Sequence, residues 1–92
     1  MQFEWDDEKA TANQAKHGVF FDEALTCFYD PNQVAFYDPE HSEAEEDREL
    51  LIGHSNRGRL LIVSYTLRDQ VVRLISARKA TNREARTYAQ GI

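Results

Sequence analysis

Three apolar runs separated by short polar turns constrain this chain more than any other feature. The runs are residues 50–55, 59–66 and 71–79, and they are rich in Leu, Ile and Val. The intervening stretches, NRG and LRDQ, have the lengths and composition of hairpin turns, and Gly58 suits a tight turn. We therefore expect three consecutive antiparallel strands onto which the remaining elements pack, with Leu61, Val63 and Ile75 in the core.

The N-terminal half carries helix signals. Asp6 stands at an N-cap position, and Asp7 and Glu8 would favour the positive end of the helix dipole. Gly18 can end this helix in a left-handed conformation. A short strand over residues 2–5 precedes it.

A second helix is predicted from about residue 21. Its apolar side chains recur at helical spacing at Phe21, Ala24, Leu25 and Phe28, and Pro31 stops it. A short strand over residues 34–37 follows. Residues 38–49 are mostly acidic and are expected to form an exposed loop or irregular edge.

The last element is a helix that begins with a capping box, in which Thr81 caps and Glu84 reaches back, and Gly91 ends it. The predicted order is β-α-α-β-β-β-β-α. This order predicts one α+β domain over residues 1–92, with the helices packed on one face of a small antiparallel sheet.

Charge divides the chain into two halves. Residues 1–49 hold fourteen acids against three cations, a net of -11, and residues 50–92 hold eight cations against two acids, a net of +6, which together give -5. Two explanations remain open: the basic half meets an anionic ligand, or the two halves neutralise each other in the fold.

Composition excludes several classes of protein. Cys27 is the single cysteine and cannot form an internal disulfide, so a reducing compartment is expected. No stretch approaches the ~20 apolar residues of a membrane span. We expect a cytoplasmic protein without contact with a membrane. His17, His41 and His54 lack metal-ligand spacing, so neither a metal site nor a cofactor is expected.

The cations near the end of the third run are candidates for binding phosphate. Regular strand alternation would place Arg78 on one face with Leu74 and Ser76, and Arg73 and Lys79 on the other. The arginine fork matches a phosphodiester and keeps its charge, so Arg78 could stabilise charge that develops at phosphorus. Alternatively, strand-end arginines pair with acids of the first half.

Two further groups of cations are expected near the end of the first helix and in a hairpin. Lys16 and His17 fall in the last turn of the first helix, where His17 could take a proton from a ribose 2′-hydroxyl. Cations at that position also satisfy the helix dipole without any function. Arg57 and Arg59 lie on the neighbouring hairpin, where surface arginines are common.

Two segments together carry a family resemblance: FEWDDEKATANQAKHGVFFDEA near the start and ISARKATNREARTYA near the end. They resemble the BrnT-type toxins of bacterial type II toxin–antitoxin systems. The resemblance implies a RelE-like fold and a ribonuclease that blocks translation by cutting RNA without a metal. It also implies a co-encoded BrnA-type antitoxin with a ribbon-helix-helix DNA-binding segment, through which the complex binds operator DNA.

The same resemblance implies site residues. Lys16, His17 and Glu23 fall in the first segment, and Arg78, Thr81 and Glu84 in the second. The expected reaction is attack of a 2′-hydroxyl on its neighbouring phosphate, which leaves a 2′,3′-cyclic end. The catalytic candidates are Arg78, Arg59, Lys16 and His17, and the RNA-binding candidates are Arg57, Lys79, Arg83 and Tyr88.

A second reading competes with the ribonuclease. Residues 38–49 would repel RNA if they lay beside Arg78, because attraction to phosphate dominates non-specific affinity. The chain would then be a catalytically weak, toxin-like subunit that binds the antitoxin and acts mainly as a co-repressor of its operon.

Overall fold

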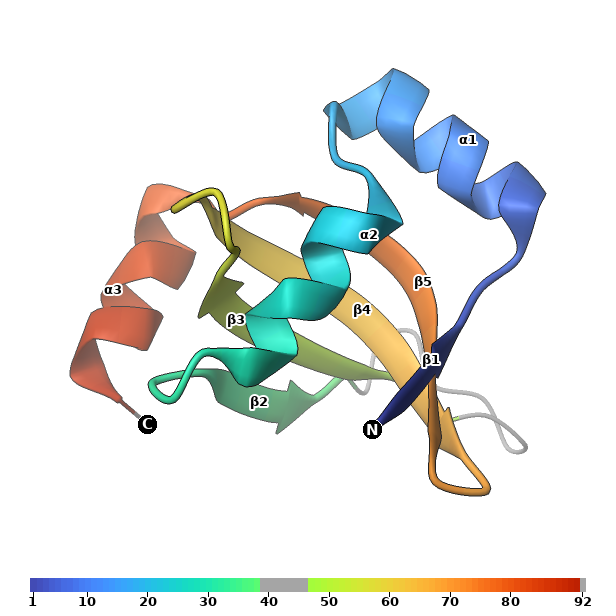
Figure 1. Ribbon diagram of the computed structural model, residues 1–92. Helices are drawn as coiled ribbons and strands as arrows, with labels where there is room; N and C mark the ends of the chain where they lie inside the picture. The colour runs from blue at the N-terminus through green and yellow to red at the C-terminus, as the bar shows by residue number, and fades with distance from the viewer. Residues whose placement is uncertain (39–46, 92) are drawn as a thin grey trace.

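The computed structural model describes residues 1–38 and 47–91 of the chain. A five-stranded sheet in the order β1-β5-β4-β3-β2 forms its centre. The strands are β1 Gln2–Glu4, β2 Val34–Tyr37, β3 Glu49–His54, β4 Leu60–Arg68 and β5 Val71–Lys79. The helices are α1 Asp7–His17, α2 Phe21–Ala24, the 3-10 helix η1 Leu25–Tyr29, and α3 Asn82–Gln90 (Figure 1).

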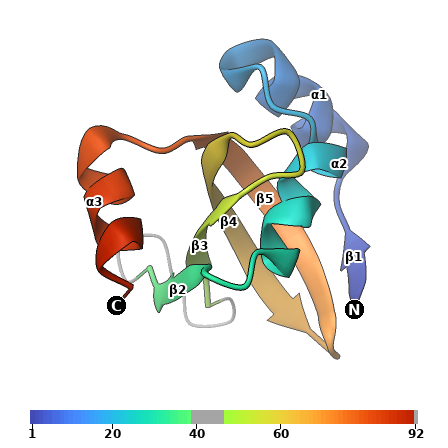
Figure 2. The same cartoon turned by 60° about the vertical axis from the view of Figure 1, so that its left-hand side comes forward.

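The predicted α+β fold and element order are confirmed, and the structure differs in two details. β1 pairs with β5 in parallel, with Gln2 opposite Val71, so the sheet is not wholly antiparallel. Pairing between the two ends of a chain is not set by a hairpin and leaves no local signal in the sequence. The second difference is α3, which lies on the opposite side of the sheet from α2 (Figure 2).

The predicted helix ends are confirmed because the capping groups make their bonds. The Asp6 carboxylate accepts from the backbone N–H of Glu8 at 2.8 Å, and Gly18 adopts the left-handed φ of 68°. Thr81 and Glu84 form the complete capping box of α3, which ends at Gly91. Local chemistry therefore decides where both long helices begin and end.

The second predicted helix is α-helical for one turn and then tightens into η1. Phe21, Ala24 and Phe28 are buried, as their spacing predicts. A Cβ at Gly53 of β3 would come within 2.9 Å of the Cys27 carbonyl oxygen. Glycine at this position therefore lets η1 lie directly against the sheet.

The regular alternation expected for β5 is wrong because the strand contains a β-bulge. Ser64 pairs with Ser76 but Tyr65 pairs with Leu74, so Ile75 is an extra residue. Leu74 consequently faces the core at 1% exposure, whereas Ser76 and Arg78 face the other side of the sheet. Leu61 and Val63 are core residues as expected, but Ile75 is only half-buried.

The acidic stretch expected at residues 38–49 falls mostly outside the described residues. Of its ends, Asp38 is buried and Glu49 begins β3. None of the described helices is long and apolar enough to cross a membrane.

Asn13 joins α1 to the edge of the sheet. Its Oδ1 accepts from the Ala77 N–H and its Nδ2 donates to the Ala77 carbonyl, both at 2.9 Å. Nδ2 also donates to the carbonyl of Val19 at 2.9 Å. Because β1 pairs only with residues 71–73 of β5, this amide takes the place of a neighbouring strand further along β5.

We predict that Asn13→Ala destabilises the fold strongly. Asn13 is 5% exposed, and its loss leaves buried N–H and C=O groups of the backbone without partners. Each such group costs about 1–3 kcal/mol, so the free energy of unfolding should fall by at least about 2 kcal/mol. Urea titration measures this, with the exposed neighbour Gln14→Ala as the control; equal effects of both variants would contradict the role given to Asn13.

Candidate functional site

Two hollows in the surface adjoin at Ser76 of β5. One, of ≈ 310 Å³, lies on the sheet face that carries Arg78 and also contains Arg48, Ser64 and Asp38. The other, of ≈ 270 Å³, lies between α1 and β5. Because both are lined by Ser76, we describe them together as the basic groove. The cationic residues that line it are Lys9, Lys16, Arg48 and Arg78, and His17 lines it as well. The acid among the described lining residues is Asp38.

Arg78 is held by α3. Its Nη1 donates to Glu84 Oε1 at 2.8 Å, and its Nη2 donates to Glu84 Oε2 at 2.9 Å. Nη1 also donates to the Lys79 carbonyl at 3.2 Å. The hydrogen bonds from Arg78 lower the pKa of Glu84, so the pair is ionic. A guanidinium has five N–H donors, and the Nε–H and one Nη2–H have no partner among the described residues. Arg78 can therefore be fixed by Glu84 and still donate to a phosphate.

Arg59 is held by a buried carboxylate. Its Nε donates to Glu23 Oε2 at 2.9 Å, and its Nη2 bonds to Glu23 Oε1 as well. The Ser55 hydroxyl donates to the same carboxylate at 2.6 Å. The hydrogen bond from Arg59 lowers the pKa of Glu23 despite a burial that opposes ionisation. Glu23 thus stays ionised at 6% exposure and fixes the orientation of Arg59.

Arg59 also contacts the end of α1. Its Nη2 donates to the Gly18 carbonyl at 3.3 Å, directly after Lys16 and His17 in the chain. Its Nη1, with two N–H groups, has no partner among the described residues. The structure therefore brings Arg59 to the same turn as Lys16 and His17, whereas Arg78 lines the other hollow of the basic groove, which adjoins theirs at Ser76.

Lys16 and His17 both line the part of the basic groove between α1 and β5. Lys16 is exposed and His17 is half-buried. Their position in the last turn of α1 also satisfies the helix dipole. The dipole explanation and a role in the groove are compatible, since both side chains reach solvent.

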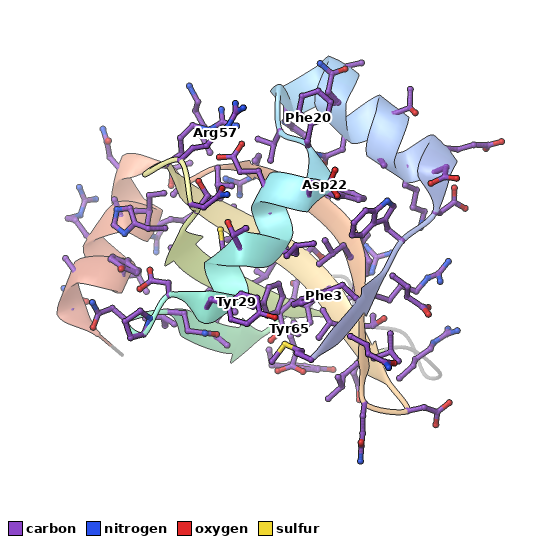
Figure 3. The ribbon with its side chains drawn as sticks, in the orientation of Figure 1. Phe3, Phe20, Asp22, Tyr29, Arg57 and Tyr65 are labelled. Carbon is purple, nitrogen blue, oxygen red and sulfur yellow. The ribbon has the colours of Figure 1, made fainter. Side chains whose placement is uncertain are left out.

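The four predicted RNA-binding residues are not gathered in one place. Arg57 lies exposed in the turn between β3 and β4 (Figure 3), and Lys79 and Arg83 are exposed near the start of α3. Tyr88 lies elsewhere on α3, and its hydroxyl donates to Asp30 Oδ2 at 2.7 Å.

The contact of Tyr88 with Asp30 belongs to a small polar cluster. The backbone N–H of His54 donates to Asp30 Oδ2 at 2.8 Å, and its ring Nδ1 lies 3.0 Å from the Tyr88 hydroxyl. Burial opposes ionisation of Asp30, but these hydrogen bonds outweigh it and lower its pKa. The same bond to Asp30 raises the pKa of Tyr88. This cluster holds α3 against the end of β3.

Sequence reasoning missed two residues of the site as candidates. Ser76, which joins the two hollows, and Arg48, which lies among acids in the sequence, gave no signal. The resemblance named Glu23 but not its partner, although an acid within the buried stretch Phe21–Ala24 requires a cation beside it. Among residues 1–38 and 47–91 no group of three His, Cys, Asp or Glu side chains is arranged to hold a metal ion.

Comparison with known families decides what this arrangement belongs to. A family model described as "Ribonuclease toxin, BrnT, of type II toxin-antitoxin system" matches residues 5–84. The chain belongs to the BrnT toxin family. The 1.1 Å crystal structure of the Brucella abortus ribonuclease toxin BrnT is similar to this fold with a TM-score of 0.63 and 26% identity. That match covers 89% of this chain and 99% of the Brucella chain. No curated protein matches.

Membership of the BrnT family confirms the resemblance that two sequence segments carried. The family is one of ribonuclease toxins of type II toxin–antitoxin systems. The co-repressor reading gains no support from either comparison. Both segments lie in the site: the first supplies Lys16, His17 and Glu23, and the second supplies Ser76 and Arg78.

The Glu23–Arg59 pair predicts acid sensitivity. The pKa of Glu23 in the folded state is below its ordinary value of 4.5, so its contribution is complete above pH 4.5 and is lost as the pH falls through the folded-state pKa. Glu23→Gln should lower the free energy of unfolding at pH 7 and should also reduce the difference in stability between pH 7 and pH 3. Urea titrations at both pH values measure this, and an unchanged difference would contradict it.

Proposed function

We propose that this chain is a metal-independent endoribonuclease that acts in the cytoplasm, inhibits translation by cutting RNA, and is neutralised by a cognate antitoxin. The observation that carries the proposal is the basic groove, in which Lys16 and His17 of α1 and Arg78 of β5 line hollows that meet at Ser76. These residues come from the two segments that relate the chain to its family, although they are about sixty positions apart.

In the proposed reaction the RNA backbone lies along the basic groove. His17 takes the proton of a ribose 2′-hydroxyl, whose oxygen attacks the adjacent phosphorus. The bond from phosphorus to the 5′-oxygen breaks, and that oxygen takes up a proton from water. The products are a 2′,3′-cyclic phosphate and a free 5′-hydroxyl. Histidine suits the role of this base, and it afterwards passes the proton that it has taken to water.

The cations stabilise charge as it develops on the phosphate oxygens. Arg78 offers the two N–H donors that Glu84 leaves, and Lys16 adds a mobile point charge from the rim. Arg59 offers its Nη1 donors beside the end of α1. Glu84 and Glu23 act as positioning residues, because each holds one guanidinium through two bonds. Arg57, Lys79 and Arg83 contribute long-range attraction for RNA.

Neutralisation by an antitoxin is a separate part of the proposal. The type II family implies a protein antitoxin, which we take to be of the BrnA type with a ribbon-helix-helix segment that binds operator DNA. Covering the basic groove would exclude RNA from Arg78 and Lys16. The net charge of -11 over residues 1–49 favours a partner segment rich in Lys and Arg.

We predict that expression of the chain without antitoxin arrests growth and that Arg78→Ala abolishes the arrest. Loss of one donor to developing charge slows such reactions by about 10²–10³-fold. Primer extension on total RNA measures the cuts.

Arg73→Ala is the matched control, since Arg73 is on the same strand but binds Glu4 at 2.7 Å away from the groove. If cells that express the folded wild-type chain grow normally and their RNA stays intact, the ribonuclease proposal is rejected in favour of the co-repressor hypothesis.

The chemistry predicts a second result with purified protein. Cleavage of RNA should persist when a chelator is present, and it should fail when the 2′-hydroxyl at the cut is replaced by hydrogen. The 3′ ends of the products should resist ligation until their cyclic phosphate is opened. His17→Ala should lower the rate. Cutting of the 2′-deoxy substrate at the wild-type rate would refute the proposed nucleophile.

A further inference from the structure

We propose that a third hollow, between α1 and α2, binds an unpaired guanine base of the RNA and so sets where the chain cuts; this rests on the proposed ribonuclease function. The hollow has a volume of ≈ 200 Å³ and is lined by Trp5, Phe20 and Phe21 together with Gln14 and Asp22. Figure 3 shows Phe20 and Asp22 at the start of α2, beside α1.

The aromatic side chains supply a stacking surface. Phe20 is 57% exposed, although the residues on either side of it, Val19 and Phe21, are 0% and 2% exposed. Trp5 is half-buried, and Phe21 holds its ring in an edge-to-face contact with ring centroids 5.8 Å apart. Packing of the core therefore accounts for Phe21 and fixes Trp5 but leaves Phe20 in solvent. Unpaired bases stack on exposed rings of this kind.

The polar side chains select among the bases. The Asp22 carboxylate is exposed and makes no hydrogen bond or ion pair with a described residue, and the same holds for the Gln14 side-chain amide. A carboxylate only accepts hydrogen bonds, so it matches two adjacent donors. Guanine presents such a pair, N1–H and N2–H₂, whereas adenine, cytosine and uracil each place an acceptor next to their donor. The Gln14 amide can donate to the guanine O6.

The position of the hollow connects it with the basic groove. α1 lines both from different sides: Lys9, Lys16 and His17 face the groove, while Gln14, two positions before Lys16, faces the aromatic hollow from nearly the opposite side of the helix. Phe20 follows the end of α1 after two residues, so the aromatic hollow is connected in the chain to the helix end that carries Lys16 and His17. A strand of RNA that passes round this end of α1 would place one base against Trp5 and Phe20 and continue its backbone toward Lys16.

The chain's only tryptophan lines this hollow, so binding can be measured without any cleavage. Titration with 5′-GMP should change Trp5 fluorescence saturably, and the affinity should exceed that for AMP, CMP and UMP by about tenfold or more, the discrimination of one bidentate contact. Asp22→Asn should remove the preference for GMP, and Phe20→Ala should weaken binding of all four nucleotides. Glu8→Gln, which removes an exposed acid of α1 outside the hollow, is the matched control.

Cleavage mapping separates this proposal from the function on which it rests. Wild-type cuts should cluster next to guanines, and Asp22→Asn should reduce the ratio of guanine-adjacent to adenine-adjacent cuts about tenfold. Specific GMP binding by a chain that cuts no RNA would uphold the guanine site and reject the nuclease. RNA cutting without guanine preference and without GMP binding would overturn the guanine site alone. It is also overturned if Phe20→Ala weakens only the complex with the antitoxin, because the hollow then serves a protein side chain.

Discussion

The two hydrogen bonds between the Asn13 amide and the backbone of Ala77 hold the site together. Asn13 is the buried residue of α1, and these bonds give Lys16 and His17, in the following turn, a fixed relation to β5. A side-chain amide reproduces the donor and acceptor of a peptide group, so it can complete a strand edge where no strand is available. The Asn13 side chain of α1 forms the hydrogen bonds of this part of the β5 edge, but α1 does not cover the whole edge. The groove between α1 and β5 is the part that stays uncovered.

The charge division between the halves has a mixed explanation. Some cations of the second half do neutralise acids of the first: Arg59 binds Glu23, and Arg73 binds Glu4. Arg78 instead pairs with Glu84 of its own half. These pairs leave guanidinium N–H groups at Arg59 and Arg78 without a partner among the described residues, so the groups that neutralise acids within the fold differ from those that could bind an anion.

Much of the fold could be predicted from local chemistry, and the parts that could not are those set by distant contacts. Asp6, Gly18, Thr81 and Glu84 fix helix ends within a few residues of themselves, so their roles are readable in the sequence. The parallel pairing of β1 and the side of the sheet taken by α3 depend on contacts between residues far apart in the chain. Candidate cations were named from residue type and resemblance, but their partners Glu23 and Glu84 became clear only from the folded geometry.

The bulge at Ile75 gives the arginines of β5 a role in folding fidelity. Before the bulge the even-numbered residue Leu74 faces the core, and after it the odd-numbered residue Ala77 does. The side chains that face the core therefore change from even to odd positions along the strand. A slip of one residue in the pairing of β4 with β5 would turn Arg73 or Arg78 toward the apolar side, where an unpaired charge is costly. The cations on β5 therefore discriminate against misaligned sheets during folding, before any ligand is present.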